Sequence, residues 1–118
     1  MIIFDAHLDL AWNAIDWNRD LRTPCDVIRQ LERDAGMTDK GRACNTVSFP
    51  DLRRGKVVIF IATLLPRLLR IGAMPAIQRY SSMVAAYGAA YGQLYYYRGL
   101  EQEGLLRGIR DRAEGSGS

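Results

Sequence analysis

The residues best suited to chemistry lie near the start of the chain, in the run Asp5-Ala6-His7-Leu8-Asp9. In an extended chain, side chains two residues apart point the same way, so His7 and Asp9 can present an imidazole nitrogen and a carboxylate oxygen to one point. Zinc accepts both kinds of ligand, but a zinc site needs three or four of them. The pair alone therefore indicates either part of a zinc site or a histidine that is hydrogen-bonded at the end of a strand.

Two apolar, β-rich runs predict the strands that would position such residues. Met1–Phe4 and Val57–Ala62 lack the alternation of polar and apolar residues that marks a strand with one face in water. We therefore expect strands that are buried on both faces, the first at residues 2–6 and the second over the run at 57–62. His7 and Asp9 would follow directly at the carboxyl end of the first strand.

Helices are expected between these strands. Leu8–Trp17 mixes polar and large apolar residues and is predicted to be a loop that leads to a helix. A helix is predicted over residues 24–35, because Thr23 and the proline after it match an N-cap with proline in the first turn. A shorter helix is expected to begin at Pro50 and to end at Gly55.

A long amphipathic helix is predicted over residues 76–103, where apolar side chains recur at spacings of three and four. Ser81 and Ser82 would cap or begin it. Gly88 and Gly92 would let another element approach closely, although each glycine costs about 0.8–1 kcal/mol of helix propensity. The expected apolar face consists of Ile77, Tyr80, Val84, Tyr87, Tyr91 and Leu94.

The order strand, helix, short helix, strand and long helix is typical of an α/β protein with parallel strands. Residues 1–114 would form one partial domain, ending in a second helical stretch, and residues 115–118 a flexible Gly/Ser tail. The three tyrosines at 95–97 would point in different directions on the helix, so they do not form one stacking surface. The 118 residues are fewer than the roughly 250 of a complete (β/α)₈ barrel.

Composition argues against several other classes of protein. The net charge of +3 comes from scattered arginines, so we expect no nucleic-acid partner. The longest apolar run, Val57–Leu65, is far shorter than the roughly 20 residues of a membrane-spanning helix, and no secretory signal begins the chain. Cys25 and Cys44 are far apart and predict free, partly buried thiols. These features favour a cytoplasmic protein.

Two segments resemble one known family, the renal-type (membrane) dipeptidases, or M19 peptidases. Residues 2–12 resemble the opening of that family, in which a strand ends in Asp-Gly-His-Asn-Asp-Leu and a Trp follows shortly. Residues 45–55 and the strand after them look like the family segment Thr-x-x-Pro-x-Leu-Arg-x-Gly. Ala6, Leu8 and Ala11 replace the usual Gly, Asn and Pro, which leaves His7 and Asp9 in place.

This resemblance implies a (β/α)₈ TIM-barrel metallohydrolase in which two zinc ions activate a bridging water for attack on a dipeptide substrate. His7 and Asp9 would be ligands of one zinc. Asp5 would support them from outside the metal's coordination sphere, or would be a strand-end residue hydrogen-bonded to backbone. The family's bridging glutamate, two later histidines and late aspartate have no counterpart here, since His7 is the only histidine. No catalytic residue is therefore assigned to this chain.

Two hypotheses follow for the function of the chain. In the first, it is the N-terminal portion of a zinc-dependent dipeptidase and carries only the first metal-ligand motif. In the second, it is an inactive truncated fragment that acts, if at all, as a self-associating structural module. Exposed strand edges and the apolar face of the long helix would favour homo-oligomers.

Overall fold

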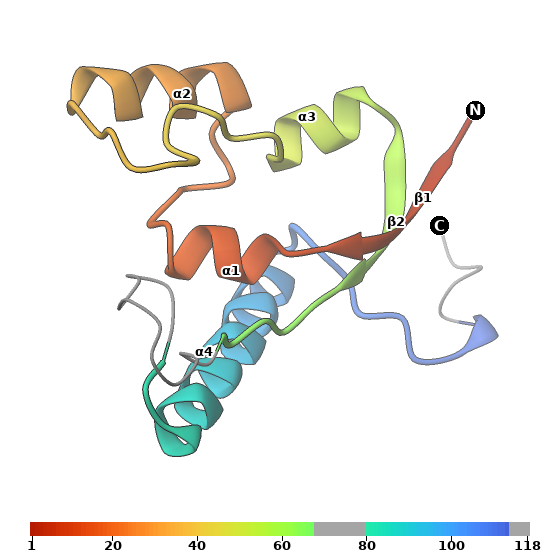
Figure 1. Ribbon diagram of the computed structural model, residues 1–118. Coiled ribbons are helices and arrows are strands. Elements are labelled where there is room, and N and C mark those ends of the chain that lie inside the picture. The colour runs from red at the N-terminus through yellow and green to blue at the C-terminus, as the bar shows by residue number, and fades with distance from the viewer. Residues whose placement is uncertain (68–79, 114–118) are drawn as a thin grey trace.

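The computed structural model describes residues 1–67 and 80–113, and the fold is mixed α/β (Figure 1). Two parallel strands and four helices make up the described part. Within these residues, no helix is both long and apolar enough to cross a membrane. The elements are β1 (Ile3–Leu8), α1 (Leu10–Ile15), α2 (Cys25–Asp34), α3 (Phe49–Arg54), β2 (Val57–Ala62) and α4 (Met83–Gln102).

β1 and β2 form the two-stranded parallel sheet, and both predicted strands are confirmed. Ile3 pairs with Val57 at one end and Leu8 with Ala62 at the other. Thr63 extends the pairing, because its backbone N–H donates to the Leu8 carbonyl over 3.1 Å. Parallel pairing brings the carboxyl ends of both strands to the same edge of the sheet.

The prediction that both faces of these strands are buried is wrong. Phe4 is 58% exposed, Val58 57% and Ile61 53%. Only Leu8 and Phe60 pack against the hydrophobic core from the sheet. The helices cover only part of the two strands, so most of their apolar side chains stay in solvent.

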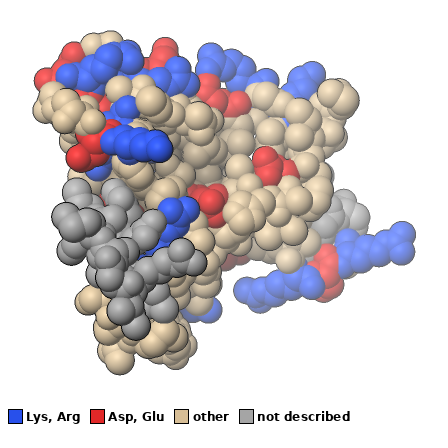
Figure 2. Space-filling model, in the orientation of Figure 1, with Lys and Arg blue, Asp and Glu red and all other residues tan. Residues whose placement is uncertain are grey.

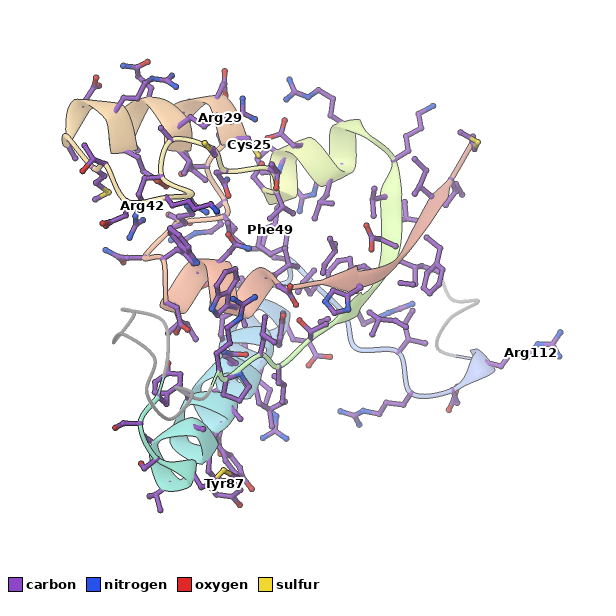
Figure 3. All side chains as sticks on the ribbon, in the orientation of Figure 1. Cys25, Arg29, Arg42, Phe49, Tyr87 and Arg112 are labelled. Atoms are coloured by element: carbon purple, nitrogen blue, oxygen red, sulfur yellow. The ribbon has the colours of Figure 1, made fainter. Side chains whose placement is uncertain are left out.

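The core lies among the helices, beside the sheet. Its buried members come from α1, the α1–α2 loop, α2, α3 and α4, and Figure 3 places Phe49 between α3 and α1. Burial of each such side chain contributes about 1.5–3 kcal/mol to folding. The buried cluster consists of Leu10, Leu21, Ile28, Phe49 and Leu100.

α1 forms where the sequence predicts a loop, which corrects that expectation. Leu10 and Ala11 are fully buried, and α1 packs against α4 directly below it in Figure 1. Asp9 occupies the N-cap position without a side-chain capping bond. Tertiary packing therefore stabilises this short helix, which has no capping signal of its own.

α2 and α3 confirm the two shorter predicted helices but correct one cap. Pro24 occupies the N-cap position of α2, and the expected cap residue Thr23 lies outside it. The N–H of Cys25 donates instead to Asp51 Oδ2 of α3, over 2.8 Å. α3 begins at Phe49, one residue before the predicted start at Pro50, and ends at Arg54, with Gly55 as the predicted stop. A carboxylate from α3 thus replaces the expected local cap of α2.

α4 confirms the long predicted helix, with a later start. Ser82 is the N-cap, and its hydroxyl oxygen accepts from the Ala85 N–H over 3.1 Å. The expected residues 76–79 lie outside the described residues. After α4, residues 104–111 are not helical, so the predicted second helical stretch is wrong over that span.

The expected apolar face of α4 is also wrong. The buried residues of the helix are Ala86, Gln93 and Leu100, seven apart, whereas Val84 is 83% exposed and Tyr87 66%. The helix is almost uniformly apolar up to its last turns, so spacing alone does not distinguish the face that packs. Figure 3 shows Tyr87 on the part of α4 farthest from the sheet.

Three further expectations about side chains have definite outcomes. A side chain at Gly88 or Gly92 would meet no atom within 4 Å, so the expected close approach is not found among the described residues. The tyrosines at 95–97 do diverge, because Tyr95 is 61% exposed while the next two pack on the core. Both cysteines are free, with Cys25 buried and Cys44 exposed.

Candidate metal centre

His7 and Asp9 meet at the carboxyl end of β1, as their spacing predicts. The imidazole Nε2 lies 3.0 Å from Asp9 Oδ1. The His7 side chain is 69% exposed and that of Asp9 26%, so the pair is open to solvent on the histidine side. The contact joins a ring nitrogen to a carboxylate oxygen at ion-pair distance.

The local backbone explains how the two side chains come together. β1 ends at Leu8, and α1 begins at Leu10, so Asp9 lies at the junction of strand and helix. The carbonyl of Asp9 accepts from the Asn13 backbone N–H over 3.1 Å, which starts the helix. Its carboxylate takes no part in capping and is free to face His7.

Asp5 has a different partner from the other two residues. Its Oδ1 accepts a 2.9 Å hydrogen bond from the backbone N–H of His7. This is the backbone interaction that one of the two sequence interpretations expects at the end of a strand. The bond also restrains the backbone of His7, so Asp5 helps to place the histidine without reaching Asp9.

Thr63 and Tyr97 complete the neighbourhood of Asp9, and sequence reasoning missed both. The Thr63 hydroxyl donates a short hydrogen bond to Asp9 Oδ1. The Tyr97 hydroxyl donates to the Thr63 carbonyl over 2.9 Å and accepts from the Ala11 N–H over 3.1 Å. Thr63 directly follows the second predicted strand, which was the one available signal. Nothing in the sequence of the long helix distinguishes Tyr97 from its neighbours.

Burial raises the pKa of the Tyr97 phenol, the hydrogen bond from the Ala11 N–H opposes this, and the nearby charge of Asp9 adds to it. The phenol therefore stays protonated at neutral pH and keeps the hydrogen that it donates to the Thr63 carbonyl. The end of β2 is thus held by a neutral donor, and Asp9 and Asp5 are the acidic groups of the site.

The glutamates that the structure describes have partners away from His7 and Asp9. Glu32 accepts two hydrogen bonds from the Arg19 guanidinium, and Glu101 accepts from the Gly108 N–H. Across residues 1–67 and 80–113, no group of three or more His, Cys, Asp or Glu side chains is placed to hold a metal ion. His7 and Asp9 therefore offer two donor side chains, fewer than the three or four that a zinc site needs.

Two hollows lie elsewhere on the described surface. The larger, about 420 Å³, lies between the α1–α2 loop and the second half of α4. The smaller, about 250 Å³, lies between α2 and the loops on either side of it. Neither includes His7 or Asp9 in its lining, so the candidate ligands occupy an open strand end.

Comparison with known proteins adds no assignment. No protein-family model matches the chain, and comparisons with curated proteins and with solved structures found no significant match. The likeness to the dipeptidases therefore depends on its two sequence segments, and the metal pair depends on its own geometry.

Proposed function

We propose that this chain is the N-terminal portion of a zinc-dependent dipeptidase barrel, in which His7 and Asp9 supply two ligands of one zinc ion. The proposal combines the two sequence segments that resemble the family with the contact at the end of β1. Its substrate would be a dipeptide, and its reaction hydrolysis of the amide bond.

The observation that carries the proposal is the 3.0 Å separation of His7 Nε2 and Asp9 Oδ1. Zinc binds such atoms at about 2.0–2.2 Å, so two ligand atoms on a tetrahedral ion lie about 3.3 Å apart. A small opening of the pair is enough to admit the ion between them. His7 would then carry its hydrogen on Nδ1 and offer the Nε2 lone pair.

The roles of the two residues follow from their chemistry. His7 would contribute a neutral nitrogen, and Asp9 an anionic oxygen that offsets part of the charge of the ion. When bound in the complete enzyme, zinc supplies a water of lowered pKa and a polarised amide carbonyl. The bridging glutamate and later histidines that the resemblance implies would supply the remaining ligands.

The sheet supports the barrel part of the proposal. Phe4, Val58 and Ile61 are more than half exposed, although parallel sheets normally have both faces covered. In a closed barrel, further strands and helices would bury such side chains, and the active site would form at the carboxyl ends of the strands. His7 and Asp9 lie at that end of β1.

Zinc titration of the chain tests the metal pair. We expect His7→Ala and Asp9→Ala each to weaken zinc binding by at least about tenfold, since loss of even an outer partner of a ligand costs about 10–100-fold. Asp39→Ala, at an exposed loop position, is the matched carboxylate control and should bind as the parent chain does. Equal zinc affinity in all four proteins would remove the ligand assignment.

A second candidate function, a self-associating structural module, is favoured by the exposed face of α4. We define the α4 stripe as Met83, Val84, Tyr87, Tyr91 and Tyr95, which are between 46% and 83% exposed. No charged residue occurs from Met83 to Tyr97, so nothing electrostatic opposes contact with the same stripe of a second copy.

A further inference from the structure

The hydrogen bonds around Asp9 give its two carboxylate oxygens different surroundings. Oδ1 accepts from the Thr63 hydroxyl and also faces His7 Nε2. Among the described residues, Oδ2 has no hydrogen-bond partner. The carboxylate is therefore held through Oδ1, whereas Oδ2 has no such restraint from the described residues.

We propose that Thr63 is a positioning residue that fixes the Asp9 carboxylate for metal binding, an inference that rests on the proposed function. The reason is a competition at His7. Its Nε2 can donate a hydrogen to Asp9 or a lone pair to a metal ion, but not both at once. When an ion takes Nε2, the direct contact of His7 with Asp9 Oδ1 is lost, and the Thr63 hydroxyl is the remaining side-chain donor to the Asp9 carboxylate among the described residues.

Thr63 is itself held at three points. Its N–H donates to the Leu8 carbonyl over 3.1 Å, and its carbonyl accepts from the Tyr97 hydroxyl over 2.9 Å. The hydroxyl has the Leu8 carbonyl at 3.2 Å and Asp9 Oδ1 closer still. An ionised carboxylate is the stronger acceptor, and a β-branched side chain has few χ1 alternatives. The donor is therefore preorganised toward Asp9.

Tyr97 extends this support to the helices. It accepts from the Ala11 N–H in α1 while it donates to Thr63 after β2, and it belongs to α4 itself. The Tyr97 hydroxyl thus connects α4 both to α1 and to the residue that follows β2. Movement of the Thr63 backbone away from Asp9 would break this part-buried hydrogen bond from Tyr97, whose ring packs against the hydrophobic core.

The test compares Thr63→Val, which keeps the shape but lacks the hydroxyl, with Thr63→Ser, which keeps the hydroxyl. Thr46→Val, at an exposed position, is the matched control. In metal-free proteins that also carry His7→Ala, so that the His7 contact cannot hold Asp9, NMR couplings from the Asp9 carboxyl carbon to its backbone report χ1. We expect one Asp9 rotamer in the parent and Thr63→Ser chains and averaging in Thr63→Val. Zinc titration should show affinity about 10–100-fold weaker for Thr63→Val alone.

The outcomes separate this inference from the proposed function. Unchanged zinc affinity in Thr63→Val, when Asp9→Ala weakens binding, would overturn the role of Thr63 and leave the metal pair standing. Equal affinity in Asp9→Ala and the parent would instead overturn the metal pair. Because the couplings are measured without metal, they show whether Thr63 orders Asp9 whatever the zinc titration gives. A single Asp9 rotamer in Thr63→Val would refute the inference.

Discussion

At the scale of single residues, the best-defined interaction in the molecule lies away from the candidate metal centre. Arg19 is 8% exposed and Glu32 5%, and the guanidinium donates to both carboxylate oxygens over 2.6 and 3.2 Å. Glu32 also accepts from the Ala43 N–H, and Arg19 donates to the Gly41 carbonyl. The Arg19–Glu32 pair therefore holds the loop after α2, through Gly41 and Ala43, against the loop before α2.

Removal of one member of this pair should be costly. We expect Glu32→Gln to lower the free energy of unfolding by about 3 kcal/mol, because it leaves the buried Arg19 charge uncompensated. Urea denaturation measures the change. The double variant Arg19→Met/Glu32→Leu should recover most of the loss, since packed apolar side chains can replace a buried ion pair. Equal stability of Glu32→Gln and the parent chain would contradict the assignment.

The same carboxylate predicts a pH dependence. Burial alone would raise the pKa of Glu32, but hydrogen bonds from Arg19 and Ala43 outweigh it and lower the pKa below its ordinary value of 4.5. The folded protein then binds fewer protons than the unfolded chain, so this stabilisation is present above the ordinary value and is lost as pH falls through the lowered one.

The Glu32→Gln protein should therefore lose less stability than the parent when urea denaturation is repeated between about pH 6 and about pH 3. Asp20, through its hydrogen bond from Arg22, and Asp51, through that from Ser48, also have lowered pKa values. Asp20 and Asp51 titrate in both proteins, so their contributions to the change in unfolding free energy cancel when the two proteins are compared. Parallel pH profiles would show that Glu32 contributes nothing to the acid sensitivity.

Sequence predicted the residue-scale site only as far as local geometry reaches. His7 and Asp9 are two residues apart, and this short separation at the end of a strand is enough to predict that they meet. Thr63 is 54 residues from Asp9, and Tyr97 is 86 residues from Ala11. Such partners depend on how β2 and α4 pack, which no spacing in the sequence encodes.

At the scale of elements, the helix caps differ in how much they connect. Ser48 is fully buried, its hydroxyl oxygen accepts from the Asp51 N–H, and its hydroxyl donates to Asp51 Oδ2 over 2.5 Å. The same Oδ2 accepts from the first N–H of α2. The cap of α3 therefore also orders the N-terminus of α2, whereas Ser82 caps α4 alone.

This difference gives a paired prediction. Loss of an N-cap side chain costs about 0.5–2 kcal/mol. We expect Ser48→Ala to lie near the upper end of that range and Ser82→Ala near the lower end, measured by urea denaturation with the slope unchanged. A larger loss for Ser82→Ala would show that Asp51 caps α2 without help from Ser48.

Element predictions succeeded where a local signal existed. Pro50 lies in the first turn of α3, Gly55 ends that helix, and Ser82 caps α4, because caps and turn residues act through neighbouring backbone. α1 was not predicted because its sequence contains no N-capping signal, and burial of Leu10 in the folded protein is what stabilises it. The buried face of α4 was missed because the helix is apolar on every side, so only its packing against α1 selects the face.

At the scale of the whole molecule, apolar surface and charge are segregated. Figure 2 shows blue and red atoms gathered along the edge formed by α2 and α3. The exposed strand residues Phe4, Val58 and Ile61 and the α4 stripe lie on other parts of the molecule and carry large apolar side chains. An apolar area of this kind marks a surface that becomes covered, whether by the rest of a barrel or by a second copy.

Contact between two copies of the chain can be tested through the α4 stripe. α4 is 20 residues, or about 30 Å, long, and one such face is smaller than the roughly 800 Å² per partner of a standard interface. We therefore expect weak, concentration-dependent association, measured by sedimentation velocity. Val84→Lys should weaken it by at least about tenfold, since like charges would face each other across the contact.

The free energy of unfolding should change by less than about 0.5 kcal/mol in Val84→Lys, because the side chain is 83% exposed. Gln102→Lys adds the same charge at an exposed position beyond the stripe and should associate as the parent does. High salt should partly restore association of Val84→Lys by screening the new repulsion. If both variants associate as the parent does, the stripe does not form the contact, and the exposed apolar side chains of the strands are the next candidates among the described residues.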